Sequence, residues 1–332
     1  MSFDSASSDV PASSAMIRLR PLYMERVWGG RELESVYGRQ LPAAGVPYGE
    51  SWEVVDRPDE QSVVTGGAYV GKTLHELWTQ HRAEIFGAAA PESERFPLLI
   101  KILDARDTLS LQVHPPASEA AALQGEPKTE MWVITGAEPG ACLYAGVTPG
   151  TTRETLAAAL ADGTAAGLVP QLPAREGDFI FIPSGRLHAI GAGLLIFEIQ
   201  QNSDTTYRVF DWNRMGLDGK PRQLHVEESL RCIDFADTAP ALGTPDSEGL
   251  LASCEYFTVH RRSAGGALPQ AVQVGGDGGF LMIGMLSGIV RTADGAELKP
   301  GDWALVPASA KGSQRQVTVS GTDDAAWLEV GF

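Results

Sequence analysis

The sequence has little cysteine, comparatively little positive charge, and no long apolar run. Its 332 residues include three cysteines, Cys142, Cys232 and Cys254, which form no CxxC or other metal-binding spacing. So few, widely separated cysteines indicate reduced thiols in a cytoplasmic protein. Lys and Arg number 26 against 42 Asp and Glu, which gives a formal net charge of -16. This balance argues against non-specific nucleic-acid binding and against an anionic membrane surface, but not against an anionic small substrate, because local cations can reverse the field in a cleft.

Targeting and nucleotide-binding signals are also missing. No apolar run approaches the roughly 20 residues that span a bilayer. Residues 1–15 have neither a basic start nor an apolar centre, so they do not resemble a signal peptide, and we expect a disordered tail. The phosphate loops GxxxxGK[ST] and GxGxxG do not occur, which argues against a nucleotide-binding fold. The composition, 43% hydrophobic and 20% charged, is typical of a globular protein.

Short apolar runs bounded by Gly, Pro and Asp dominate the chain. They include SWEVV, FPLLIKIL, TLSLQV, EMWVI, DFIFIP, LLIFEI, FLMIGML, DWALVP and AAWLEV. Strands at this density predict a mainly β protein, a sandwich or barrel. Helices are predicted at 72–87, where Thr73 is the cap, at 151–163 and at 225–235. The WGG that begins at Trp28 is interpreted as a turn.

A stretch rich in Pro, Gly and small polar residues, 237–249, is predicted to be a linker between two domains. Residues 16–236 then form an N-terminal domain, which carries the chemistry described below. Residues 250–332 form a second, C-terminal domain. The length of the chain is ample for two hydrophobic cores.

Part of the first domain is repeated in the second. PGDWALVPAS has the same Gly-Asp, strand, Pro pattern as EGDFIFIPSG. Counting along the repeat places Gly312 where the first domain has His188, and Met282 where it has Glu130. The second domain is therefore expected to be a barrel that keeps the fold and lacks metal ligands.

Polar side chains that suit a divalent metal stand at strand ends in the first domain. In TLSLQVHPP, Gln112 and His114 lie two residues apart on a predicted strand, so they point to the same face. Glu130 precedes another apolar run, and a Pro/Gly turn aims His188 inward. A single histidine is more often a core residue. Two imidazoles, a carboxylate and an amide together favour a metal of zinc or iron type.

Three cations accompany these residues. Lys101 in LIKIL stands between apolar neighbours, so it is either an edge residue or a buried functional amine. Lys128 lies two residues before Glu130 and shares its strand face. Arg208 follows the strand after His188 and has the planar fork that suits a phosphate or an enediolate oxygen. Taken singly, each is more often a solvated surface charge.

These motifs resemble the type I phosphomannose isomerase family, also called mannose-6-phosphate isomerase, in its short bacterial form. The resemblance covers nearly the whole chain after the tail and rests on VWGGREL, GESWEVVDRP, FPLLIKILDARDTLSLQVHP, PKTEMWVI, GDFIFIPSGRLHAIGAG and QQNSDTTYRVFDWNR. It implies two tandem cupin-type jelly-roll barrels with a few helices. It also implies interconversion of mannose 6-phosphate and fructose 6-phosphate by metal-assisted proton transfer through a cis-enediol.

The resemblance also assigns roles to individual residues. One Zn²⁺ per chain is matched by four ligands: Gln112, His114, Glu130 and His188. Arg208 matches an arginine regarded as catalytic, Lys101 and Lys128 match lysines that line the sugar-phosphate site, and Glu198 matches an acidic residue near the reacting carbons. Glu198 and Lys101 are both candidates for the general base, and Arg208 for stabilising oxyanion charge or holding phosphate. The expected partner is a small sugar phosphate, with no nucleic acid or membrane, for a monomer or a homodimer.

Two other functions fit parts of the pattern. Two histidines and one carboxylate with open positions also describe the Fe(II) site of a cupin oxygenase. A non-catalytic sugar-binding cupin would keep the site without turnover. An amide as a fourth ligand, together with the surrounding cations, favours the isomerase over both.

Overall fold

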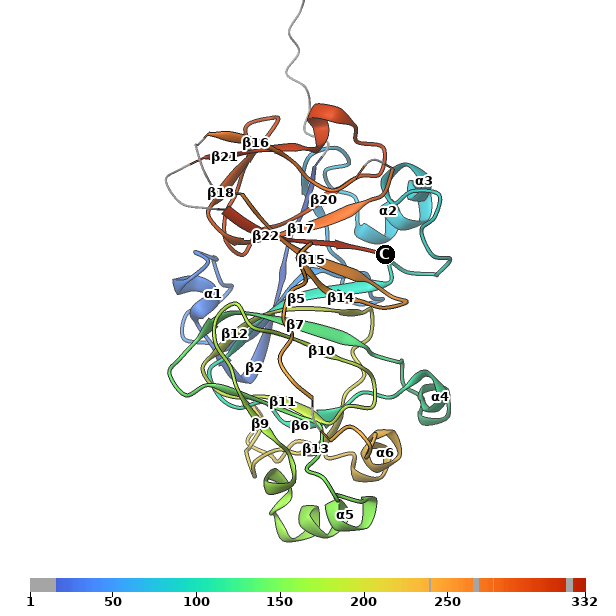
Figure 1. Ribbon diagram of the computed structural model, residues 1–332, viewed down its shortest axis with the longest axis vertical. Helices are drawn as coiled ribbons and strands as arrows, with labels where there is room; N and C mark the ends of the chain where they lie inside the picture. Colours follow the sequence, from blue (N-terminus) through green and yellow to red (C-terminus); the bar gives the residue numbers. More distant parts are fainter. Residues whose placement is uncertain (1–15, 239, 265–268, 277, 321–324) are drawn as a thin grey trace, which may run out of the picture. The chain divides into compact units, whose positions relative to one another are not determined.

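The computed structural model describes residues 16–238, 240–264, 269–276, 278–320 and 325–332 (Figure 1). The tail predicted over residues 1–15 lies outside the described residues. Antiparallel strands make up most of the regular structure in the rest, so the prediction of a mainly β fold is confirmed. No helix in the described part of the chain is long and apolar enough to cross a membrane.

The chain forms two compact units, each assembled from separate segments. The larger unit holds residues 20–62 and 91–260, together with Phe332. The smaller unit holds 16–19, 63–90 and 261–331. Residues 63–90, which the sequence places in the N-terminal domain, thus group with the C-terminal segment.

Strand pairing explains this grouping. The first strand, β1 (Ile17–Leu19), pairs on one side with β4 (Val64–Gly66) and on the other with β20 (Trp303–Val306). The described residues of 237–249 form no helix or strand. They are held to the larger unit, because Arg186 donates two hydrogen bonds to the Asp237 carboxylate, at 2.6 and 2.9 Å.

The larger unit is built on two antiparallel sheets. The six-stranded sheet has the order β10-β7-β12-β5-β2-β3 and the five-stranded sheet the order β13-β6-β11-β8-β9. The strands of the first are β2 (Leu22–Gly30), β3 (Tyr48–Val54), β5 (Leu98–Ala105), β7 (Glu130–Ala137), β10 (Phe179–Ile182) and β12 (Leu194–Gln201). The strands of the second are β6 (Leu111–Val113), β8 (Cys142–Ala145), β9 (Gln171–Pro173), β11 (His188–Ile190) and β13 (Tyr207–Phe210).

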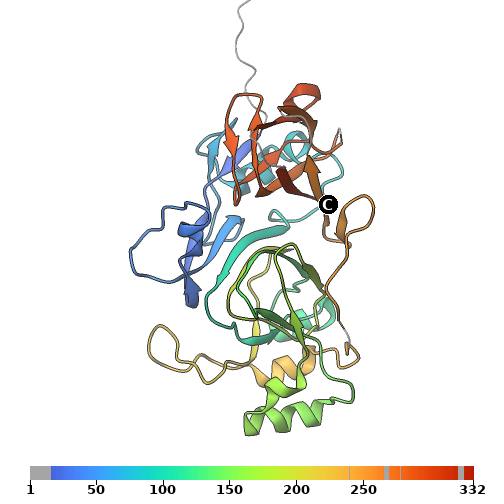
Figure 2. The same cartoon turned by 60° about the vertical axis from the view of Figure 1, so that its left-hand side comes forward.

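The two sheets pack face to face. Side chains from both sheets form one apolar core between them, which includes Trp28, Leu103, Trp132, Ile134, Leu143, Ile180, Ile190 and Ile196. The opposite face of the five-stranded sheet packs on α5 (Arg153–Asp162) and α6 (Val226–Cys232), through a second core with Leu111, Val113, Leu156, Tyr207, Val209 and Leu230. Both views show these helices beyond the five-stranded sheet (Figures 1 and 2). Because side chains alternate along a strand, each residue of the five-stranded sheet faces either the helices or the six-stranded sheet.

The predicted helices form, with changed ends. Thr73 caps α2 (Leu74–Gln80) by accepting a hydrogen bond from the backbone N of Glu76, and the Glu76 side chain completes a capping box. The helix predicted over 72–87 breaks at His81, after which α3 (Arg82–Ile85) begins. Two shorter helices are α1 (Glu32–Ser35) and α4 (Ala117–Ala120).

The interpretation of WGG as a turn is wrong. These three residues end β2, and Gly29 is a glycine for a steric reason. A Cβ atom on Gly29 would lie 2.3 Å from the backbone N of Gly49, so only glycine lets β2 and β3 approach this closely.

The smaller unit repeats one turn of the larger unit, hydrogen bond for hydrogen bond. Gly177 N donates to Ile134 O at 2.8 Å, and Gly301 N donates to Met285 O at 2.9 Å. Counting four residues back along each strand aligns Glu130 with Leu281, one residue before the Met282 that the sequence suggests. Neither Leu281 nor Met282 has a side chain typical of a zinc ligand. That the whole units are copies of each other stays a prediction.

The remaining strands lie between Leu250 and Gly331, and most of them belong to the smaller unit. The strands are β15 (Thr258–Ala264), β16 (Gln270–Gln273), β17 (Leu281–Ser287), β18 (Ile289–Thr292), β19 (Glu297–Leu298), β21 (Gln316–Ser320) and β22 (Ala325–Gly331), and β14 (Leu250–Ser253) forms a hairpin with β15. Their apolar core includes Val274, Ile283, Met285, Val290, Leu298, Val306 and Trp327.

Candidate active site and metal centre

Three candidate residues form a row across the five-stranded sheet. Gln112 on β6 lies directly opposite Arg208 on β13 and His188 on β11. Since Leu111 and Val113 point to the helix-covered core, Gln112 points to the other face, toward the six-stranded sheet. Strand register thus places an arginine, an amide and an imidazole side by side.

A second row crosses the six-stranded sheet. Glu198 on β12 lies opposite Lys101 on β5 and opposite Trp132 on β7. Trp132 belongs to the core between the sheets, so its neighbours Glu198 and Lys101 face the same interior. Glu130 begins β7, two residues before Trp132 and on the same face.

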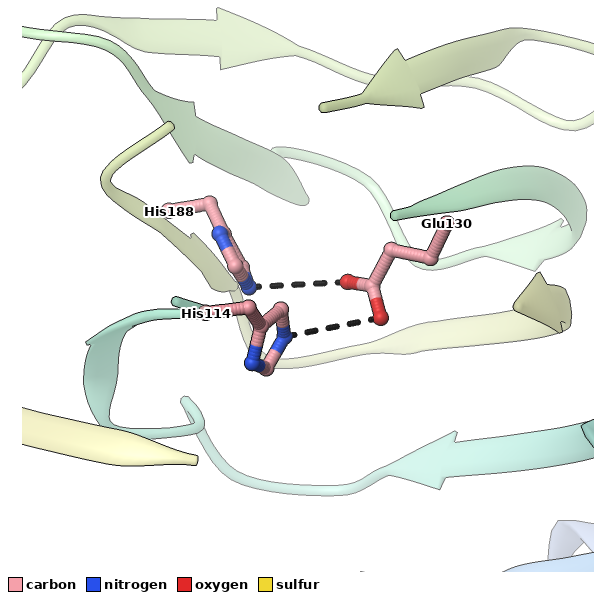
Figure 3. A group of neighbouring side chains, drawn as sticks. All are labelled: His114, Glu130 and His188. Atoms are coloured by element: carbon pink, nitrogen blue, oxygen red, sulfur yellow. Dashed lines mark ion pairs between the residues drawn. The ribbon is translucent and has the colours of Figure 1, made fainter. Parts of the chain in front are cut away.

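Three buried side chains converge where the two rows meet (Figure 3). His114 Nε2 and His188 Nε2 each lie 3.5 Å from a different oxygen of the Glu130 carboxylate. One donor atom from each residue lies within 4.8 Å of the others, and this is the single such group of His, Cys, Asp or Glu within the described ranges. His114 Nε2 and Glu130 Oε1 have no hydrogen-bond partner, although both are buried. Unpaired buried atoms of this kind fit a cation.

The far side of each imidazole is held by a backbone carbonyl. His114 Nδ1 lies 2.9 Å from Thr205 O, and His188 Nδ1 lies 2.9 Å from Arg186 O. A proton on Nδ1 satisfies each carbonyl and leaves the lone pair of Nε2 directed at the centre of the group, the tautomer that binds metals. Burial lowers the pKa of both imidazoles, that of His188 to about 3, so both are neutral at physiological pH.

A lysine balances the charge of the carboxylate. Lys128 Nζ lies 2.8 Å from Glu130 Oε2 and 4.0 Å from Glu198 Oε1. Burial opposes ionisation of Glu130, but the Lys128 ammonium is the main group that outweighs it, and the pKa of Glu130 is held well below its usual value. The group therefore offers one anionic and two neutral ligands, a donor set that suits Zn²⁺.

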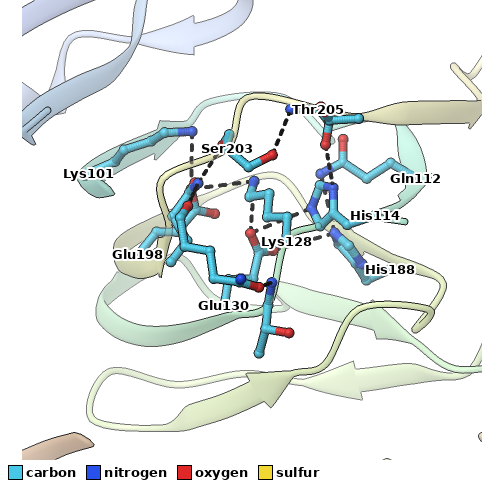
Figure 4. Close-up of polar contacts among 12 residues, drawn as sticks. Lys101, Gln112, His114, Lys128, Glu130, His188, Glu198, Ser203 and Thr205 are labelled. Carbon is cyan, nitrogen blue, oxygen red and sulfur yellow. Dashed lines mark hydrogen bonds and ion pairs between the residues drawn. The ribbon is translucent and has the colours of Figure 1, made fainter. Parts of the chain in front are cut away.

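Glu198 differs from Glu130 in its surroundings (Figure 4). Its Oε2 accepts a hydrogen bond from Trp132 Nε1 at 2.9 Å, while Oε1 lies 3.2 Å from Lys101 Nζ without a hydrogen bond. Burial, together with the nearby Glu130 charge, raises the pKa of Glu198, and the two lysines only partly oppose this. A buried carboxylate with a raised pKa and a free oxygen can exchange protons.

A polar cavity of about 400 Å³ lies beside the buried group of His114, Glu130 and His188, which does not itself line it. Its lining contains Arg26, Glu50, Lys101, Gln112, Lys128, Glu198, Asp204, Arg208, Arg222 and His225, with Trp28, Leu103, Leu109 and Ile190 as apolar walls. The guanidinium of Arg208 is held by hydrogen bonds to Ser110 Oγ at 3.2 Å and to Gln223 O at 3.0 Å. Five lining residues are cationic when His225 is not counted, and three are acidic, so the excess of positive charge suits an anionic ligand of modest size.

The structure brings all the residues singled out in the sequence to one place. Lys101, in particular, is a buried amine and not an edge residue, since it is 4% exposed. Sequence reasoning missed Arg26, Glu50 and Arg222. The sequence could have indicated Glu50, because this charged residue directly precedes the apolar run SWEVV, and the structure places both in a strand that is buried throughout. His225 also lines the cavity and accepts a hydrogen bond from Arg208 N at 3.3 Å.

The chain is similar to known proteins over almost its full length. Residues 16–131 match the family described as phosphomannose isomerase type I, catalytic domain. A mannose-6-phosphate isomerase of Streptococcus mutans is 37% identical over 310 residues, which are 89% of this chain and 94% of the relative. The crystal structure of the mannose 6-phosphate isomerase from Bacillus subtilis superposes with a TM-score of 0.82 at 32% identity, covering 96% of this chain and 99% of that one.

A more distant structure, described as a zinc-bound mannose 6-phosphate isomerase, has a TM-score of 0.74 at 19% identity and covers 96% of this chain and all of its own. At that identity it shows a shared fold alone. The relatives that are more than 30% identical are matched along nearly their whole length. On that similarity, the chain belongs to the type I phosphomannose isomerase family of enzymes.

Proposed function

We propose that this protein interconverts mannose 6-phosphate and fructose 6-phosphate. The observation that carries the proposal is Glu198 Oε1, which accepts no hydrogen bond and lies in a cavity with five cationic lining residues, beside the buried group of His114, Glu130 and His188. An aldose-ketose isomerase needs these parts together: a group that moves a proton between adjacent carbons, a means of stabilising charge on the sugar oxygens, and a place for phosphate.

One Zn²⁺ per chain is proposed to bind to His114, Glu130 and His188, with Gln112 as the fourth ligand. The donor set supports zinc, and the zinc-bound state of the distant relative agrees with it. Gln112 lies beside His188, with Nε2 3.3 Å from the imidazole Nε2, and turning its amide over presents the oxygen there instead. The bound ion would polarise the sugar oxygens without a redox change.

Glu198 is proposed as the general base, ahead of Lys101. In the direction of fructose 6-phosphate, the C2–H bond breaks and the proton passes to Glu198 Oε1. The bonding electrons form the C1–C2 double bond of the enediol while the aldehyde oxygen gains a proton. Glu198 then returns its proton to C1, and the O2 hydroxyl loses a proton, which balances the one that the aldehyde oxygen gained and leaves the ketone at C2. Lys101 Nζ lies 3.2 Å from Glu198 Oε1, and its positive charge favours the ionised form of Glu198, which is the form that can accept the proton.

Arg208 is proposed to stabilise negative charge on the reacting oxygens. It stands next to Gln112 across the sheet, and its two hydrogen bonds fix the guanidinium at the cavity wall. Preorganised cations of this kind act where charge develops in the transition state. Lys128 and Lys101 add positive charge for the sugar phosphate on the opposite wall.

A coupled assay for fructose 6-phosphate, together with metal analysis of the purified protein, tests this function. Turnover of mannose 6-phosphate by protein that holds zinc is the expected result. Iron in the protein, with oxygen uptake and no isomerisation, would point to an oxygenase instead. The ratio kcat/KM for mannose 6-phosphate over mannose measures how much the cations contribute.

We also propose a cytoplasmic location and a monomer or homodimer. The location is supported by the three cysteines, which are all free. Cell fractionation tests the first proposal, and size-exclusion chromatography with light scattering tests the second.

A further inference from the structure

We infer that Glu50, held by Arg26, is a positioning residue that keeps the Lys101 ammonium at the right distance from Glu198. The inference rests on the proposed function, since it concerns the base of that reaction. Neither Arg26 nor Glu50 was singled out by the sequence. Both line the cavity, and Glu50 is 8% exposed.

Both oxygens of Glu50 are fixed by other donors. Arg26 binds them in a bidentate fashion, with Nε 2.9 Å from Oε1 and Nη2 3.1 Å from Oε2. Trp52 Nε1, two residues along β3, donates to Oε2 at 2.6 Å. A bidentate Arg–carboxylate pair with a third donor has little freedom to move. The ionised form is favoured as well: burial opposes it, but Lys101 and Arg26 lower the pKa of Glu50 to about 2.

Lys101 lies between this fixed carboxylate and the base. Its Nζ is 3.8 Å from Glu50 Oε2 and 3.2 Å from Glu198 Oε1, and it sits 5.2 Å from the centre of the Trp52 ring. Since Glu50 already accepts from Arg26 and Trp52, it attracts Lys101 by charge at 3.8 Å. The ammonium is thereby shared between two carboxylates, and Glu198 Oε1 remains without a hydrogen bond.

Loss of the Glu50 charge would leave Glu198 as the main counterion of Lys101. In a buried site the ammonium would then close on Glu198 Oε1 and occupy the lone pair that must accept the substrate proton. Substrate binding would not suffer, because the cavity would gain one unit of net positive charge. The reaction step, and not affinity for the sugar phosphate, should therefore respond to Glu50.

Glu50→Gln tests this role, because glutamine keeps the size of the side chain and an oxygen for Trp52. We expect kcat for mannose 6-phosphate to fall roughly 10- to 100-fold, with KM unchanged or lower and with the zinc content and Tm of the wild type. Glu50→Asp restores the charge on a shorter side chain and should recover part of the lost kcat. Glu34→Gln is the matched control, because it removes an exposed ion pair with Arg31 outside the cavity and should leave kcat as it is.

Wild-type kcat in Glu50→Gln would overturn the inference. So would a fall in kcat that comes with loss of zinc or a lower Tm, because that result indicates a purely structural role. If Glu50→Gln does not fold, Arg26→Gln takes its place: it frees Glu50 to bind Lys101 directly, and an unchanged kcat would again refute the role. If the wild-type enzyme itself does not isomerise mannose 6-phosphate, the proposed function fails and the inference fails with it.

Discussion

Replacing Lys128 by methionine probes the electrostatics of the metal centre. The Lys128 side chain is 5% exposed and lies 2.8 Å from Glu130 and 4.0 Å from Glu198. Methionine has a similar length and volume, so Lys128→Met removes the charge without opening a large cavity. In the metal-free protein, two buried carboxylates then lose their shared counterion.

The size of the effect follows from that geometry. Removing one partner of a buried ion pair costs about 3–5 kcal/mol, and for a domain of this size 1 kcal/mol shifts Tm by about 2–4 °C. We therefore expect the Tm of the metal-free protein to fall by about 10 °C. A bound divalent cation would replace Lys128 as the counterion of Glu130, so the zinc-loaded protein should lose less. If about 2 kcal/mol of the cost disappears on metal binding, Lys128→Met binds zinc roughly 30-fold more tightly.

Thermal unfolding with excess chelator and with excess zinc, together with zinc titration, measures both effects. Lys72→Met is the control, because Lys72, just before α2, pairs with Glu76 at 3.8 Å where both side chains are partly exposed, and such a pair contributes less than about 1 kcal/mol. The reasoning is refuted if the metal-free Lys128→Met protein unfolds at the wild-type temperature. Weaker zinc binding than in the wild type would refute it as well.

Three more predictions concern single residues. Arg208→Ala should lower kcat by roughly 100-fold or more and keep its zinc by metal analysis; loss of the metal or wild-type turnover would contradict the role of Arg208. Burial raises the pKa of Asp104 to about 6, although the carboxylate accepts a hydrogen bond from Glu32 N at 2.6 Å. The protonated form thus stabilises the fold below about pH 4, and this contribution disappears as the pH rises through 6. The difference in free energy of unfolding between Asp104→Asn and the wild type should therefore shift by about 1–2 kcal/mol in favour of the variant as the pH rises from 4 to 7, after allowance for solvent screening. Chemical denaturation at both pH values measures this, and a pH-independent difference would contradict it. Gly29→Ala should lower stability by about 3 kcal/mol, because its Cβ would lie 2.3 Å from the backbone of β3. Gly167→Ala, where a Cβ would meet nothing within 4 Å, is the control, and equal thermal unfolding of the two variants would contradict this explanation.

The elements that escaped sequence analysis share a physical cause. Short strands such as β11 and β13 have three or four residues, too few for alternation to stand out from chance. The end of β2 contains two glycines, which indicate a turn unless the close approach of β3 is known. Residues 63–90 group with the C-terminal segment because β1 pairs across the sequence with β20, a contact that local patterns do not encode.

The sequence alone determined the strand-rich fold and the residues with metal-binding chemistry. A period of two along a strand places Gln112 and His114 on one face, and this local rule holds wherever the strand lies. Tertiary structure decided what those residues meet. Strand register set Arg208 beside Gln112 and Glu198 beside Lys101, and the packing of the two sheets placed Glu130 within 3.5 Å of both imidazoles. Distances between side chains on separate strands depend on pairing and packing across the chain, so they appear only when the whole chain is folded.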